Sequence, residues 1–103
     1  MSYKIVFQST ARADLISISE YISKDFLEPV IAEKLVVSIV KHIRSLSEMP
    51  KRNKLIADEP FKSKGYRVTY VKNYAVFYKV DDTTNVVTVM RVLYNRREWQ
   101  NFI

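Results

Sequence analysis

Residues 65–82 read GYRVTYVKNYAVFYKVDD, and this stretch is dominated by the β-branched and aromatic residues that favour strands. Two β-forming runs are separated only by Lys72-Asn73, a pair suited to a tight hairpin turn. A third run follows at residues 86–93, after a polar turn at residues 81–85. The C-terminal half is therefore predicted to form a three-stranded β-meander.

The first part of the chain predicts a strand and then a helix. Residues 3–8 alternate and are rich in β-forming side chains, so we expect a first strand there. Ser9 or Thr10 is suited to be the N-cap of a helix that should end near residues 25–26. Asp14 falls in the first turns, where a carboxylate interacts favourably with the helix dipole.

A second amphipathic helix is predicted between two prolines. Pro29 suits a first helical turn, and Pro50 should stop the helix. Between them the apolar residues recur every three or four positions: Ile31, Leu35, Ile39, Ile43 and Leu46. The resulting order β-α-α-β-β-β predicts an α+β fold, with an antiparallel helical hairpin packed on one face of a small, largely antiparallel sheet.

Residues 51–64 are expected to form one long, polar and basic loop. Leu55, Ile56 and Phe61 are the apolar residues in it, and we expect them to hold the loop against the body of the protein. Gly65 is the only glycine in the chain and stands just before the second strand. A bend of the backbone or a close approach is predicted at this position, because glycine tolerates both.

The composition indicates one soluble domain over residues 1–103. There is no cysteine, and the N-terminus has no long apolar segment, so we expect a cytoplasmic protein with no membrane partner. The net charge of +6 is uneven, because residues 48–103 hold eleven basic and six acidic residues. This asymmetry favours nucleic acid or an acidic protein as partner, and the alternative is a charge that only keeps the protein soluble.

Most catalytic chemistry has no matching residues in this chain. A single histidine, His42, without any cysteine predicts no metal site and no cofactor, and one glycine cannot build a glycine-rich phosphate loop. Asp81-Asp82 is interpreted as a turn. Basic and phenolic groups remain, and they are compatible with metal-free phosphodiester cleavage. The alternative interpretation is that half of the tyrosines only pack in the core or at its rim.

Four motifs follow one another along the chain: Asp14-Leu15-x-x-Ile18-x-x-Tyr21-Ile22, Leu46-x-x-x-Pro50, the hairpin over residues 65–80, and Arg91-Val92-Leu93-Tyr94-Asn95-Arg96-Arg97-Glu98-Trp99. In this order they resemble the RelE/ParE superfamily, toxins of type II toxin–antitoxin modules, over nearly the whole chain. The resemblance implies a small α+β toxin that is neutralised by a cognate antitoxin. Operator DNA is expected to be bound only through the toxin–antitoxin complex.

The resemblance implies two different activities, since ParE-like members poison DNA gyrase and RelE-like members cut mRNA in the ribosomal A site. Positions that carry a catalytic arginine and a C-terminal tyrosine in RelE-like toxins fall at Ala75 and Phe102, and a histidine position falls at or beside Leu93. These replacements and the long helical hairpin favour a ParE-like toxin that is not an enzyme. The expected target-binding residues are Arg91, Tyr94, Arg96, Arg97 and Trp99.

Two alternatives stay open. The first is a RelE-like mRNA interferase, a metal-free endoribonuclease that acts on the ribosome with its mRNA. In that activity Arg67 and Arg96 would hold the scissile phosphate, and Tyr94, Lys62 or Lys64 would transfer protons. The second alternative is a family member without toxic activity, which only binds its antitoxin and represses the operon.

Overall fold

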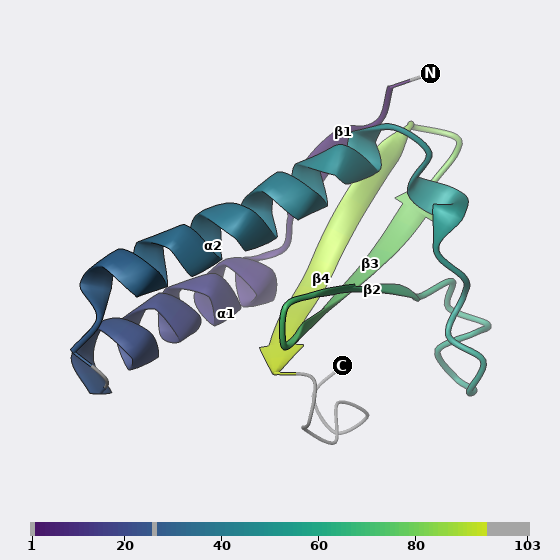
Figure 1. Ribbon diagram of the computed structural model, residues 1–103. Coiled ribbons are helices and arrows are strands. Elements are labelled where there is room, and N and C mark those ends of the chain that lie inside the picture. The colour runs from purple at the N-terminus through teal and green to yellow at the C-terminus, as the bar shows by residue number, and fades with distance from the viewer. Residues whose placement is uncertain (1, 26, 95–103) are drawn as a thin grey trace.

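The computed structural model describes residues 2–25 and 27–94. Its elements follow the predicted order (Figure 1). They are β1 (Lys4–Phe7), α1 (Ser9–Glu20), a π-helical turn (Tyr21–Asp25), α2 (Pro29–Arg44), two 3₁₀ turns (Ser45–Ser47 and Pro50–Arg52), β2 (Arg67–Val71), β3 (Tyr74–Asp81) and β4 (Val86–Tyr94). Within the described residues no helix is long and apolar enough to cross a membrane.

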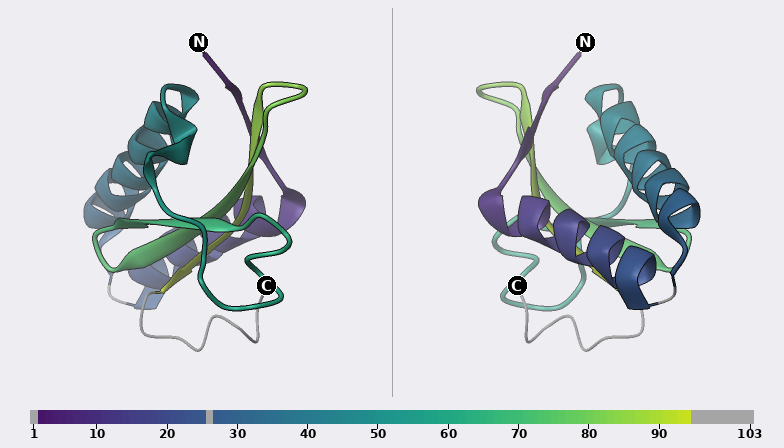
Figure 2. Two further views of the ribbon diagram at one scale, coloured as in Figure 1. Left: turned by 90° about the vertical axis from the view of Figure 1, so that its right-hand side faces the viewer. Right: turned by 90° about the vertical axis from the view of Figure 1, so that its left-hand side faces the viewer.

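The four strands form one sheet in the order β1-β4-β3-β2. The meander β2–β3–β4 is antiparallel throughout, and β1 joins its β4 edge in parallel. Figure 2 shows the strong twist of this sheet. The predicted α+β class and largely antiparallel sheet are therefore confirmed.

The helical hairpin covers one face of the sheet, as the apolar spacing of both helices predicts. Ala11 of α1 and Ile39 and Ile43 of α2 are fully buried against Val76 of β3 and Val89 of β4. Apolar side chains that recur every three or four residues lie on one side of a helix, which is why these positions meet the sheet together.

The opposite face of the sheet is covered by the long loop. Ile56 and Phe61 are buried on this face against Ala75 and Phe77, which confirms that these two loop residues hold the loop in place. The same expectation for Leu55 was wrong: its side chain is 40% exposed, and only its main chain contributes, through a bridge to Arg67.

One extra residue in β4 decides which way its side chains point. Phe77 lies opposite Arg91, whereas Tyr78 lies opposite Val89, so Met90 is inserted as a bulge. The bulge shifts the alternation by one residue, and Val89 and Val92 both join the core under the helices although they are three positions apart.

Two expectations about α1 need correction. Gln8 occupies the N-cap, while the hydroxyl of Thr10 donates to the carbonyl oxygen of Met90 at 2.8 Å instead of capping the helix. Asp14 lies beyond the first turn of α1, so the helix dipole does not account for it. The helical run ends at Asp25 in the π-helical turn, and residue 26 lies outside the described residues.

Helix α2 begins with Pro29 in its first turn, as predicted, and ends at Arg44, followed by a 3₁₀ turn before Pro50. Gly65 has a φ of +78°, and a methyl group added there would meet no atom within 4 Å. The glycine is therefore needed for a bend of the backbone and not for a close approach. Asp81 serves as a turn residue, because its side chain accepts hydrogen bonds from the main-chain N–H groups of Thr83 and Thr84.

His42 joins α2 to β2 and predicts how stability depends on pH. Its Nε2 lies 2.9 Å from the hydroxyl of Thr69, and burial, then the charge of Arg52, lowers the pKa of His42. The unfolded chain then binds a proton more readily than the folded one, so stability falls as pH drops below about 6.5. We expect urea unfolding at pH 5.5 to need less denaturant than at pH 7.5. His42→Gln should flatten this difference, and an equally steep dependence in that variant would contradict the assignment.

Candidate partner-binding groove

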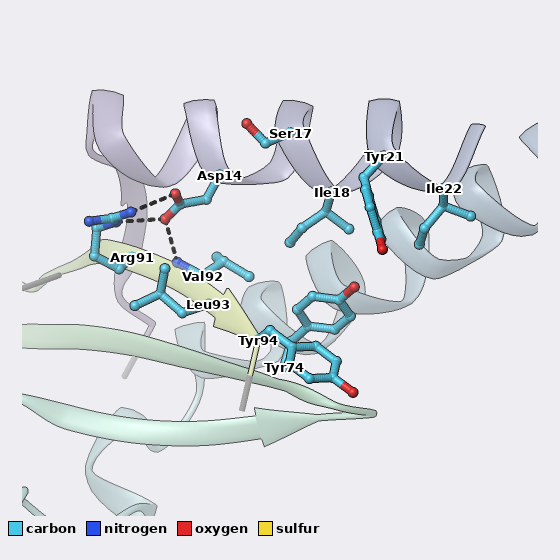
Figure 3. A pocket seen from close by; sticks show the side chains of 10 residues that line it. All are labelled: Asp14, Ser17, Ile18, Tyr21, Ile22, Tyr74, Arg91, Val92, Leu93 and Tyr94. Atoms are coloured by element: carbon cyan, nitrogen blue, oxygen red, sulfur yellow. Dashed lines mark hydrogen bonds and ion pairs between the residues drawn. The ribbon is translucent and has the colours of Figure 1, made fainter. Parts of the chain in front are cut away.

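A groove of about 900 Å³ runs between α1 and the C-terminal half of β4 (Figure 3). Its helical wall carries Ser17, Ile18, Tyr21 and Ile22, and its sheet wall carries residues of β3 and β4: Tyr74, Arg91, Val92, Leu93 and Tyr94. We call this the α1–β4 groove. Its lining is mostly apolar and phenolic, the composition found where proteins bind other proteins.

The groove exists because β1 is short. Among the described strands, β1 alone pairs with that edge of β4, and its pairing ends at Phe7 opposite Val89. The chain then turns into α1, whose polar side chains continue along the edge of the strand. Thr10 donates to the carbonyl oxygen of Met90, and Asp14 accepts the N–H of Val92 at 2.9 Å. Beyond Asp14 the helix and the strand edge enclose the groove.

Asp14 and Arg91 form the polar end of the groove. The guanidinium Nε and Nη2 of Arg91 donate to the two carboxylate oxygens of Asp14 at 2.7 and 2.8 Å, a two-point pairing (Figure 3). The side chains are 21% and 13% exposed. The hydrogen bonds to Asp14 raise the pKa of Arg91, so its positive charge is retained at every physiological pH.

Tyrosines form the other end of the groove. The rings of Tyr74 and Tyr94 meet edge to face at 5.7 Å. Burial, and then the neighbouring phenols of Tyr94 and Tyr21, raises the pKa of Tyr74. Tyr74 therefore stays protonated near neutral pH and is not a general base. Rings of this kind suit contact with a partner, because each offers a broad apolar face and one polar atom.

The residues expected from sequence to bind the target separate into three groups. Arg91 and Tyr94 both line the α1–β4 groove. Arg96, Arg97 and Trp99 lie outside the described residues. Arg91 is engaged with Asp14 inside the protein, so the part of it that a partner can reach is limited.

The structure does not bring the proposed nuclease residues together. Arg67 lies opposite Tyr78 and Tyr94 lies opposite Tyr74, which are four residues and roughly 13 Å apart along β3. The guanidinium of Arg67 donates to the carbonyl oxygen of Asn53 at 2.6 Å and so fastens the loop. Lys62 and Lys64 are exposed on that loop.

Arg67 instead has other basic neighbours, which sequence reasoning did not associate with it. Lys51, Arg52 and Arg67, here called the basic cluster, lie near the buried phenol of Tyr78 and the carboxylate of Asp82. Tyr78 donates to the carbonyl oxygen of Pro50 at 2.7 Å. Burial raises the pKa of Tyr78, so this phenol too remains protonated near neutral pH.

Asp14, Tyr21 and Tyr74 are the groove residues to which sequence reasoning gave no role. A signal for two of them was present, because Asp14, Ile18 and Tyr21 are spaced by four and three residues and so share one side of a helix. Tyr74 carried no such signal. In the described part of the chain, no three histidine, aspartate or glutamate side chains come together to hold a metal ion.

Solved structures with this fold are toxins of toxin–antitoxin systems. The chain is 23% identical to a chain of the RelBE2 complex of Mycobacterium tuberculosis, with a TM-score of 0.70 over 91% of this chain and 99% of that one. The chromosomal ParDE system of P. aeruginosa gives 19% identity and a TM-score of 0.74, over 90% and 96% of the two chains. A mutant of E. coli RelE in the free state gives 18% and 0.65, over 93% and 86%.

At these identities the structural likeness shows the fold alone. Comparison with curated proteins finds no match. A family model, by contrast, matches residues 5–99 and describes the ParE toxin of the type II toxin–antitoxin system parDE. Because that match spans nearly the whole chain, the protein belongs to the ParE toxin family, within the RelE/ParE superfamily of type II toxins.

Proposed function

We propose that this toxin arrests growth by poisoning DNA gyrase and that a cognate antitoxin neutralises it by occupying the α1–β4 groove. The observation that carries the proposal is the match of residues 5–99 to the ParE toxin family. RelE and ParE structures of the same fold include toxin–antitoxin complexes, which supports an antitoxin as partner.

The groove supports the antitoxin part of the proposal. Its walls combine the apolar side chains of Ile18 and Ile22 with the rings of Tyr74 and Tyr94. An antitoxin segment that buries these groups gains affinity from the apolar area removed from water, and the phenol groups can donate hydrogen bonds to it. The excess positive charge of the C-terminal half favours a segment with acidic residues.

The gyrase part is supported by the absence of an assembled set of proton-transfer groups within residues 2–25 and 27–94. Ala75 is only 2% exposed and packs beneath the loop, so an inert side chain occupies the position of the RelE-type arginine. Arg67 and Tyr94 lie at different ends of β3. A toxin that works by binding needs no such set, whereas a nuclease needs its acid and base within hydrogen-bond reach of one phosphate.

Ribosome-dependent mRNA cleavage is the second candidate, and the basic cluster is the observation that favours it. Lys51, Arg52 and Arg67 offer positive charge for a phosphate next to the phenol of Tyr78. The raised pKa of Tyr78 and its hydrogen bond to Pro50 weigh against it as the base.

Pulse-labelling of DNA and protein synthesis in the minutes after induction of the toxin alone separates the candidates. We expect DNA synthesis to fall first while translation continues, and the purified toxin to inhibit supercoiling by gyrase. An early fall in translation would contradict the gyrase proposal and support mRNA cleavage. Normal growth would instead indicate a protein that only binds its antitoxin.

A further inference from the structure

An exposed apolar surface lies at the end of the helical hairpin, where the chain enters α2. Leu27, Val30 and Ile31 are 80%, 61% and 54% exposed, and together we call them the hairpin patch. None of the three lines the α1–β4 groove. In Figure 1 this end of the hairpin lies on the opposite side of the molecule from the long loop. Three large apolar side chains side by side on a surface of this size indicate a binding site.

The backbone at Leu27 makes the exposure more unusual. Its φ is +53°, a left-handed conformation that costs any residue with a Cβ and that asparagine and glycine adopt more readily. Leucine at this position is thus unfavourable in its backbone and also in its exposed side chain. A strained residue that presents an apolar side chain to solvent is characteristic of a site kept for binding.

The hairpin patch stands on a well-held support. The main-chain N–H of Glu28 donates to the carbonyl oxygen of Ile22 at 3.3 Å and so ties the start of α2 to the π-helical turn. Ala32, one turn into α2, is fully buried and anchors that turn in the protein. The patch is therefore preorganised, and little conformational entropy would be lost when a partner binds it.

The charges around the hairpin patch differ in sign from those of the rest of the chain. Residues 20–34 hold four acidic and two basic residues, in a protein with a net charge of +6. Glu28 and Glu33 are exposed beside the patch, and Lys24 is paired with Glu20. An acidic border around an apolar centre is complementary to a protein surface with an apolar pocket and a border of lysine or arginine. It repels nucleic acid and acidic peptides.

We infer that the hairpin patch is a second docking surface, separate from the α1–β4 groove, through which the toxin binds the protein that it arrests. Leu27 enters an apolar pocket on that protein, and lysine or arginine residues around the pocket face Glu28 and Glu33. The inference rests on the proposed function in one respect, that the toxin acts by binding a protein target.

Leu27→Asn tests the inference without damaging the fold. Asparagine accepts the left-handed backbone and prefers solvent, so this variant should be at least as stable and more soluble than the natural protein. We expect it to need at least about tenfold more toxin for the same growth arrest, since removal of a central apolar anchor has effects of this size. Val30→Ser, which leaves the strained residue alone, should weaken growth arrest in the same direction.

Ile16→Ser is the matched control, because Ile16 is 59% exposed on α1 and belongs neither to the groove nor to the patch. It should arrest growth like the natural protein. Growth arrest by Leu27→Asn and Val30→Ser at natural strength would overturn the inference. A change from dimer to monomer with unchanged growth arrest would also overturn it and would make the patch a contact between copies. If gyrase is unaffected by the natural toxin while growth arrest still depends on the patch, only the proposed target fails.

Discussion

Replacement of Phe77 by alanine is expected to lower the free energy of unfolding by roughly 4 kcal/mol, the usual cost of removing a buried aromatic ring. Phe77 is 1% exposed on the face of the sheet that lies under the long loop, where it belongs to one core cluster with Ile56 and Phe61. The loop has no helix or strand of its own on that face, so the ring is a large part of what holds it down.

Urea unfolding followed by circular dichroism measures this loss. Limited proteolysis should in addition show faster cleavage within residues 57–64, because the loop would detach before the sheet unfolds. Leu55→Ala is the control on the same loop, and its 40% exposed side chain should cost less than about 1 kcal/mol. Equal losses for Phe77→Ala and Leu55→Ala would mean that the loop does not cover this face in solution.

Asp14→Ala is expected to cost about 3 kcal/mol, because a largely buried ion pair is broken from one side. The carboxylate of Asp14 accepts two hydrogen bonds from Arg91 and one from the main-chain N–H of Val92. The alanine side chain replaces none of these acceptors. Since the same contacts join α1 to the edge of β4, the wall of the groove should loosen and binding of the antitoxin should weaken with it.

Two further variants separate the ion pair from other effects. Asp14→Asn keeps one acceptor oxygen and should lose about half as much stability. Glu20→Ala breaks the other ion pair of this helical region, Glu20 with Lys24, whose side chains are 56% and 74% exposed. That pair should contribute less than about 0.5 kcal/mol. A loss for Asp14→Ala no larger than for Glu20→Ala would show that the groove pair is solvent-exposed in solution.

The elements and their order followed from local patterns in the sequence. Alternating β-formers on both sides of Lys72-Asn73 predicted the hairpin, and apolar residues every three or four positions predicted α2. Gly65 before β2 predicted a bend, which its φ of +78° confirms. These predictions succeed because strand, helix and turn preferences act over a few neighbouring residues.

The candidate site was only partly predictable. Arg91 and Tyr94 were expected to bind a partner and do line the groove, whereas the facing residues Asp14 and Tyr74 were given no such role. Arg67 was grouped with Tyr94 because both are reactive residues on the meander. A residue's place along a strand relative to its neighbours depends on the register, and the register is not visible in residue types alone.

The short-range pattern of the chain was thus enough for the two helices, the meander, the turns and the loop residues Ile56 and Phe61. Packing alone settled the parallel position of β1 beside β4, the bulge at Met90 and the pairing of Asp14 with Arg91, 77 residues apart. Local preferences are set by a residue and its few neighbours. Contacts between distant segments are chosen by the burial of one shared core, which exists only when the whole chain is folded.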